Sequence, residues 1–195
     1  MICAIVLAAG RSRRMGVQKL LLPIHGEPLI ARVVDEVLAS PVDRVFVVVG
    51  TDAAAITAAL AGRRISIVCN PAGEGEMLSS VRCGLQALPA DCDAVLVVLG
   101  DQPGISRSVM AQLADAFRTG PHGIVVPVYH GRRGHPLLFA TGYRDEILRT
   151  YDSLGLRGLL QAHPDEVCEL PVDLPGVLED LDLPDDYRRL QQRTV

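Results

Sequence analysis

The residues with the most evident chemical potential lie at positions 10–19, which read GRSRRMGVQK. This segment contains two glycines, three arginines and one lysine, and it follows the apolar run ICAIVLAA, which predicts a buried strand. Glycines allow backbone N–H groups to approach an anion closely, and the cationic side chains supply the opposing charge. The segment therefore predicts a site for a nucleoside triphosphate at the carboxyl end of the first strand.

The spacing in this loop excludes two common phosphate-binding motifs. A Walker A loop requires a lysine directly after its second glycine, whereas Lys19 follows Gly16 by three residues and Leu20 stands in place of the magnesium-binding hydroxyl. The loop also does not match the dinucleotide motif G-x-G-x-x-G. A solvated surface loop is the alternative interpretation, and the gathering of four cations around two glycines argues against it.

A second chemical feature is the carboxylate of Asp101, in the sequence GDQP that follows the apolar run 94–99. A carboxylate at the end of a buried strand needs a cationic partner. Mg²⁺ on a triphosphate meets this need, because the ion prefers one or two carboxylates, with phosphate oxygens completing its shell. The alternative is an aspartate that caps a helix or forms a turn ahead of Pro103.

Further acidic residues lie near the carboxyl terminus, in the run LEDLDLPDDY. Asp180 and Asp182 alternate, so on an extended segment both side chains face the same way. One of the two is expected to complete a metal site with Asp101. Asp185 and Asp186 instead suit the first turn of a final helix, where negative charge is favourable to the helix dipole.

These motifs together resemble a known family. Residues 7–19, LAAGRSRRMGVQK, resemble the signature L-A-[AG]-G-x-S-x-R-M-G-x-x-K of the nucleotidyltransferases that attach a nucleotide to molybdopterin. GDQP is similar to the family's G-D-x-P motif, whose aspartate binds metal, and GRRGHP at 131–136 resembles its acceptor segment G-x-R-G-H-P. The acidic run resembles D-[IV]-D-T-P-E-D, although Leu183 replaces the threonine. The resemblance extends over essentially the whole chain.

The resemblance implies a role for each matching position. Catalysis is expected of Arg14, Lys19 and Asp101. Magnesium is expected at Asp101 together with Asp180 or Asp182. The positions expected to bind the nucleotide are Leu7, Ala8, Ala9, Gly10, Arg11, Ser12, Lys19, Asn70, Ser79, Ser80, Gly84 and Asp101. Those expected to bind the acceptor are Gln102, Pro103, Arg133, Gly134, His135 and Arg157.

Some of these roles have a plain structural alternative. Ser79 and Ser80 lie near the start of an expected helix, where they suit ordinary capping as well as contact with a base or a phosphate. His135 precedes a proline and suits a packed turn. Arg133 suits a bidentate grip on a phosphate or on the edge of a pterin ring.

The implied reaction is attack of a substrate phosphate on the α-phosphorus of a nucleoside triphosphate, with release of pyrophosphate. Ala9 favours CTP, because relatives with L-A-A-G resemble cytidylyltransferases and those with L-A-G-G resemble guanylyltransferases. The alternatives are a transferase of the same fold that uses GTP or another phosphorylated acceptor, and a non-catalytic carrier of molybdenum cofactor for a molybdenum hydroxylase. A metal-dependent glycosyltransferase would require a D-x-D motif where this chain has Asp101-Gln102-Pro103.

Composition limits the class of protein. The chain has 195 residues, 49% hydrophobic and 22% charged, with a net charge of −4 that argues against nucleic acid as a partner. Its five cysteines form no C-x-x-C pair, which is typical of reduced thiols in a cytoplasmic protein. The sequence shows no secretory leader and no apolar stretch of membrane-spanning length, so no membrane association is expected.

The elements that must position these residues alternate along the chain. Strands are expected at 2–8, 44–49, 65–68, 94–99, 124–129, 136–139 and 167–170, and helices at 29–38, 53–60, 77–88, 106–117 and from 184, with two short helices before 167. This pattern predicts one α/β domain over residues 1–195, a doubly wound, mostly parallel sheet with a small antiparallel addition beside the turn at 130–134. Ligands of such sheets bind outside the carboxyl ends of the strands, where the loop 10–19 and Asp101 meet.

Overall fold

A single eight-stranded mixed sheet organises the molecule in the computed structural model, which describes residues 1–10, 12, 15–72 and 77–192. Seven strands follow the order β10-β7-β9-β6-β1-β4-β5, and the short β8 pairs with β7 at the side of this path. The strands are β1 (Ile2–Ala8), β4 (Arg44–Val49), β5 (Ser66–Cys69), β6 (Ala94–Leu99), β7 (Ile124–Tyr129), β8 (Arg132–Arg133), β9 (Leu137–Ala140) and β10 (Val167–Pro171).

The centre of the sheet consists of continuous apolar strands because both of its faces are covered. β1 pairs in parallel with β4 on one side and with β6 on the other. The helices are α1 (Leu29–Leu38), α2 (Ala53–Ala59), α3 (Met77–Ala87), α4 (Arg107–Thr119), α5 (Arg144–Arg149), α6 (Leu156–Ala162) and α7 (Pro184–Gln192). The described residues also form the 3-10 helices η1 (Lys19–Leu21), η2 (Thr141–Tyr143), η3 (Pro164–Glu166) and η4 (Pro175–Leu178).

Two separate hydrophobic clusters show that the sheet is doubly wound. One contains the buried residues of α1, α2 and α4 with alternate residues of the central strands, and the other contains those of α3, α5 and α6 with the intervening residues. Within β1, for example, Val6 belongs to the first cluster and Ile5 to the second. Ser106 caps α4 as expected, since its side chain accepts a hydrogen bond from the N–H of Ser108. The expected α/β class and doubly wound sheet are therefore confirmed.

The expected antiparallel pairing of the strands that flank the turn at 130–134 is confirmed, since β7 pairs with β9. β9 also pairs antiparallel with β6, so it lies between β6 and β7 within the main sheet, a position that the sequence did not predict. A small hairpin of β2 (Pro23–Ile24) and β3 (Glu27–Pro28) was not predicted from the sequence, and its turn residues His25 and Gly26 have φ of 52° and 85°. Among the described residues, no helix combines the length and apolar character needed to cross a membrane.

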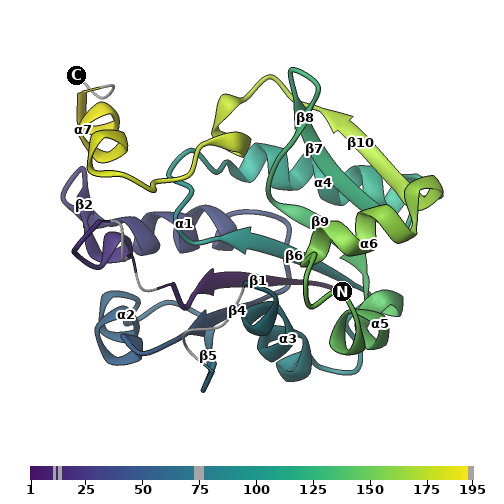
Figure 1. The fold of residues 1–195 in the computed structure, drawn as a ribbon, viewed down its shortest axis with the longest axis horizontal. Coiled ribbons are helices and arrows are strands. Elements are labelled where there is room, and N and C mark those ends of the chain that lie inside the picture. Colours follow the sequence, from purple (N-terminus) through teal and green to yellow (C-terminus); the bar gives the residue numbers. More distant parts are fainter. Residues whose placement is uncertain (11, 13–14, 73–76, 193–195) are drawn as a thin grey trace.

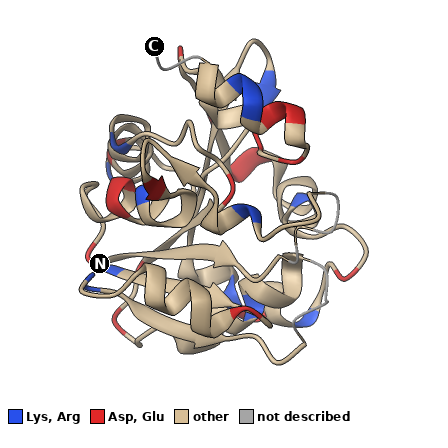
Figure 2. Ribbon diagram, turned by 90° about the vertical axis from the view of Figure 1, so that its left-hand side faces the viewer, with Lys and Arg blue, Asp and Glu red and all other residues tan. Residues whose placement is uncertain are grey.

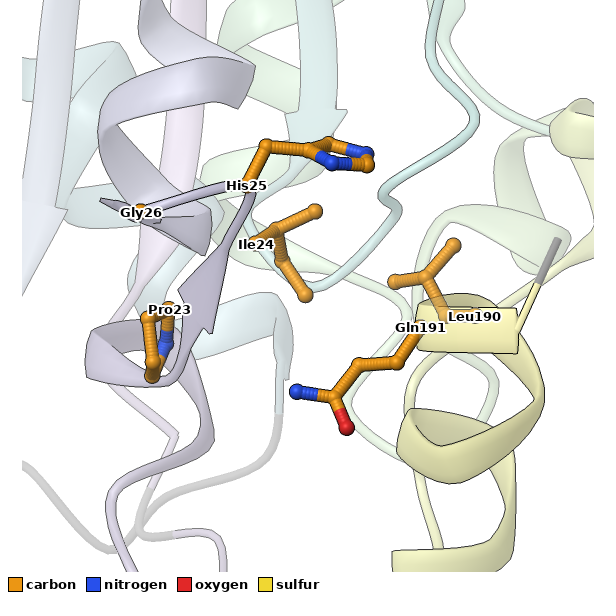
Figure 3. A pocket seen from close by; sticks show the side chains of 6 residues that line it. All are labelled: Pro23, Ile24, His25, Gly26, Leu190 and Gln191. Atoms are coloured by element: carbon orange, nitrogen blue, oxygen red, sulfur yellow. The ribbon is translucent and has the colours of Figure 1, made fainter. Parts of the chain in front are cut away.

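The final helix lies beside this hairpin. In Figure 1 the arrowheads of β1 and β6 point toward the side of the molecule where α7 and β2 lie. The Tyr187 hydroxyl donates a hydrogen bond of 2.8 Å to the Pro23 carbonyl. A cavity of about 340 Å³ separates the rest of the two elements, with Ile24 on the hairpin side and Leu190 on the α7 side (Figure 3). The carboxyl-terminal segment is thus tied to the chain that follows Lys19.

Candidate functional site

The candidate site forms where β1 and β6 end side by side. The parallel register pairs Leu7 with Leu99, and the N–H of Gly100 donates a 3.0 Å hydrogen bond to the Leu7 carbonyl. The loop after β1 and the aspartate after β6 therefore leave the same edge of the sheet together. This juxtaposition was predicted from the order of the elements, and the structure brings Lys19 and Asp101 into direct contact.

Lys19 occupies the centre of the site. Its ammonium nitrogen lies 2.5 Å from Asp101 Oδ2 and 3.0 Å from Asp182 Oδ1, and the residue is only 9% exposed. Burial alone would lower the pKa of Lys19, but the two carboxylates outweigh it and raise the pKa above its ordinary value. Lys19 therefore stays protonated and lies between two carboxylates at the carboxyl ends of the central strands.

The carboxyl-terminal acidic run reaches this site by pairing with the chain after β6. The N–H of Leu181 donates to the Asp101 carbonyl at 3.0 Å, and Gln102 Nε2 donates to Asp180 Oδ1 at 2.9 Å. Asp180 and Asp182, expected to face the same way, therefore have different partners. Loss of hydration raises the pKa of Asp180, and the negative charges of Asp101 and Asp182 add to the rise.

The loop before Lys19 is held by a glutamine that the sequence analysis did not single out. Gln18 Oε1 accepts a 3.0 Å hydrogen bond from the Ser12 hydroxyl, while Gln18 Nε2 donates to Asp52 Oδ2 at 2.5 Å and to the Gly10 carbonyl at 3.4 Å. Ser12 Oγ in turn accepts the N–H of Lys19 at 3.0 Å. Ser12 therefore positions Lys19 through its backbone. Arg11 was expected to bind the nucleotide and Arg14 to act in catalysis. Both lie outside the described residues.

A cavity of about 310 Å³ opens directly beside Lys19. Its lining includes Leu7, Ala9, Gly10, Ser80 and Asp101, all expected to contact the nucleotide. Two other expected residues serve the core instead. The Ala8 side chain is buried in the cluster beneath α1, and Gly84 lies where α3 crosses β1, so that a Cβ at this position would come within 2.6 Å of Ile5 Cγ2.

Asn70 joins the end of β5 to the first turn of α3. The residue is 5% exposed, and its Nδ2 donates to Ser79 Oγ at 3.0 Å and to Ser80 Oγ at 3.1 Å. Its Oδ1 accepts the N–H of Ala72 at 3.0 Å. Both ends of the Asn70 amide are therefore bound within the protein, and of the two serines that it contacts Ser80 lines the cavity.

A second cavity, of about 550 Å³, adjoins the first and shares Met77, Leu99 and Asp180 with it. Five of the six residues expected to bind the acceptor line this second cavity, namely Gln102, Arg133, Gly134, His135 and Arg157. The sixth, Pro103, borders a separate hollow with Leu181 and Arg189. Arg132 and the α6 residues Leu160 and Gln161 also line the cavity, and no sequence motif distinguished them.

The polar lining of the second cavity includes two buried atoms without a hydrogen-bond partner among the described residues. These atoms are Gln102 Oε1 and His135 Nδ1. Burial lowers the pKa of His135, which favours the neutral ring near neutral pH. Arg133 lies at the rim, where its Nε donates to Glu169 Oε1 at 2.7 Å. Buried polar atoms of this kind suit a polar ligand.

The oxygen atoms around Lys19 are suitable for a divalent cation. Asp101 and Asp182 present hard carboxylate oxygens to one point, the arrangement that Mg²⁺ and Mn²⁺ prefer when phosphates supply further ligands. The described residues contain no cluster of three or more His, Cys, Asp or Glu side chains placed to hold a metal ion. Figure 2 looks onto this edge of the sheet and shows basic and acidic residues interspersed.

Comparison with known proteins connects this geometry to a family. The model of the MobA-like NTP transferase domain matches residues 4–180. Among solved structures, Rv0371c from Mycobacterium tuberculosis H37Rv superposes with a TM-score of 0.86 and 30% identity, over 98% of this chain and 97% of that one. A complex of Rv0371c with manganese gives a TM-score of 0.82 and 28% identity, over 100% of this chain and 99% of that one.

This chain matches one curated relative over nearly its whole length and another over only part of its length. Nicotine blue oxidoreductase of Paenarthrobacter nicotinovorans is 29% identical over 198 residues, which cover 97% of this chain and 96% of that protein. The bifunctional protein GlmU of Sinorhizobium fredii is 33% identical over 169 residues, which cover 84% of this chain and 35% of that protein. The chain thus spans about a third of the length of the GlmU relatives that it matches.

Proposed function

Since the chain belongs to the MobA-like NTP transferase family, we propose that it moves CMP from CTP to the phosphate of a molybdopterin-type acceptor and releases pyrophosphate. One observation carries the proposal: the Lys19 ammonium is held between Asp101 and Asp182 beside the smaller of two adjoining cavities. The smaller cavity suits the nucleotide. The larger cavity, with its arginines, suits an anionic acceptor.

In this reaction an acceptor phosphate oxygen forms a bond to the α-phosphorus of CTP, and the bond from the α-phosphorus to the bridging oxygen of the pyrophosphate breaks. The attacking oxygen is already anionic, so no general base is required. Lys19, joined by Arg14 from the same loop, stabilises the charge that develops on the pyrophosphate. Catalysis then consists of positioning and charge neutralisation.

Asp101 and Asp182 are the residues that would hold Mg²⁺, with Asp180 beside them. When bound, the ion supplies charge neutralisation to the phosphates of the nucleotide. The manganese complex of Rv0371c supports a divalent cation in a relative with this fold. Before the nucleotide and the ion bind, Lys19 would keep both carboxylates paired. The ion would then compete with Lys19 for the same carboxylates.

The proposals of CTP as the nucleotide and of a molybdopterin-type acceptor depend on the sequence resemblance. Ala9, in L-A-A-G, favours CTP over GTP, and the GRRGHP segment favours a molybdopterin-type acceptor. Arg133 and Arg157 both line the larger cavity, where guanidinium groups can bind a phosphate. The alternative for the same site is a transferase that uses GTP or another phosphorylated acceptor. We propose that the protein acts in the cytoplasm.

The test is pyrophosphate release with Mg²⁺ and molybdenum cofactor, using CTP, GTP, ATP and UTP in turn. We expect release with CTP, and loss of release in Asp101→Asn with the protein still folded. Release with GTP alone would contradict the base assignment. Tight binding of the cofactor without release from any nucleotide would instead indicate a carrier that serves a molybdenum hydroxylase.

A redox activity is the second candidate, because the relative named nicotine blue oxidoreductase aligns over nearly the whole chain. Mixing the protein with nicotine blue and NADH or NADPH tests it by absorbance. Oxidation of the nicotinamide that depends on the protein would favour this candidate. Pyrophosphate release without such oxidation would favour the transferase.

A further inference from the structure

The Asn70 amide has a single possible orientation. Its Oδ1 faces the N–H of Ala72 at 3.0 Å, an interaction that only an oxygen acceptor can make. If the amide were turned over, its NH₂ group would face that N–H, and two donors would oppose each other. The Asn70 Nδ2 atom is therefore the one that lies 3.0 Å from Ser79 Oγ and 3.1 Å from Ser80 Oγ.

This orientation determines how the serine hydroxyls are used. An amide NH₂ group donates only, so each serine oxygen accepts from Asn70 and its O–H proton must point elsewhere. Ser80 is 6% exposed and lines the nucleotide cavity together with Ala9 and Gly10. Since Ser80 lines the cavity and its oxygen accepts from Asn70, its hydroxyl proton can point into the cavity.

We propose that Asn70 is a positioning residue that orients the Ser80 hydroxyl as a hydrogen-bond donor to the nucleotide base. The site then selects a base with an acceptor at that edge, such as the O2 carbonyl of a pyrimidine. A base that presents an N–H at the same place meets a second donor and is disfavoured. This inference rests on the proposed function only in that the smaller cavity binds a nucleoside triphosphate.

The substitution Asn70→Asp tests the inference, because it keeps the oxygen that faces Ala72 and replaces the NH₂ donor by an acceptor. The Ser80 hydroxyl then donates to residue 70 and is lost to the base. Binding of CTP and of inorganic tripolyphosphate is measured by calorimetry with Mg²⁺ and without acceptor. We expect the Kd of CTP to rise about 10- to 100-fold, the range of one hydrogen bond to a buried group.

Tripolyphosphate has no base, so its Kd should change only by the effect of the added negative charge. Its binding also reports that the variant is folded. The neutral variant Asn70→Leu should weaken CTP binding while leaving tripolyphosphate binding unchanged. A merely structural role of Asn70 would weaken both ligands alike in Asn70→Leu, and that result would overturn the inference.

A double-mutant cycle with Ser80→Ala isolates the interaction. In the Ser80→Ala background, Asn70→Asp should add no loss of CTP affinity beyond the change seen with tripolyphosphate. A full additional loss would mean that Asn70 acts through another group. If the unaltered protein binds CTP and Asn70→Asp binds it equally well, the inference alone fails. If the unaltered protein binds no nucleoside triphosphate, the proposed function fails with it.

Discussion

Replacing Lys19 by Met removes the cation that holds two carboxylates together, and the structure allows the cost to be estimated. Breaking a fully buried ion pair costs about 3–5 kcal/mol. The side chains of Asp101 and Asp182 are 24% and 47% exposed, so water can hydrate them once Lys19 is gone. We therefore expect Lys19→Met to lower the free energy of unfolding by about 1–3 kcal/mol, less than for a fully buried pair.

The same substitution should reduce pyrophosphate release much more severely than stability. Loss of one group that stabilises developing charge typically slows turnover by about 100- to 1,000-fold. Urea unfolding and pyrophosphate release measure the two effects, and Lys19→Arg, which keeps the charge, should recover most of the stability. Turnover of Lys19→Met within threefold of the unaltered protein would refute the assigned role of Lys19.

The pH dependence of stability gives an independent check on the environment of Lys19. The pKa of Lys19 is raised above its ordinary value of 10.5. A raised pKa of a cation contributes stability that is fully present below the unfolded pKa and is lost as the pH rises through the folded pKa. The unaltered protein should therefore lose stability above about pH 10.5, and Lys19→Met should lack this component of the loss.

Three further predictions concern glycines and an ion pair. Gly10→Val should fold normally, because a Cβ at Gly10 meets no heavy atom of the described residues within 4 Å apart from its chain neighbours, but should weaken binding of CTP measured by calorimetry. Gly84→Ala should lower the free energy of unfolding by about 1–3 kcal/mol, since its methyl group would overlap Ile5, and urea titration checks this. The Tyr151 hydroxyl and His163 lower the pKa of Glu146. The stability from this carboxylate is present above its ordinary pKa of 4.5 and lost as the pH falls, so acid unfolding of Glu146→Gln should lack that component.

The sequence was most informative where local pattern and burial agree. The apolar run of β1, the amphipathic spacing of α1 (Leu29–Leu38) and the isolated aspartate after β6 each follow from a few neighbouring residues. β9 was recognised as a strand, but its insertion between β6 and β7 depends on long-range packing that no local pattern encodes. The two-residue strands of the β2–β3 hairpin are too short to show any periodicity.

The candidate site shows the same difference between what local sequence patterns predict and what depends on three-dimensional contacts. Asp101 was predicted because charge at the end of a buried strand is unusual, and Lys19 because cations and glycines gather in its loop, whereas Gln18 and Arg132 look like ordinary polar loop residues. Asn70 and Ser80 were predicted as direct ligands, but their mutual hydrogen bonds could be seen only in three dimensions. Gly84 carried a family motif for a reason of packing, since α3 must approach Ile5 closely.

The two cavities also divide the chain in a way that bears on acceptor choice. The cavity proposed for the nucleotide is lined mainly by residues before position 102, including Lys19 and Ser80, whereas the cavity proposed for the acceptor draws Arg133 and Arg157 from later segments. Two residues near the carboxyl terminus are exceptions, since Asp180 lines the smaller cavity and Asp182 binds Lys19 across 163 residues of sequence. On the proposed function, we expect substitutions in β8 and α6 to alter acceptor binding without disturbing the ion pairs of Lys19. A fold arranged in this way allows relatives with one nucleotide chemistry to act on different acceptors.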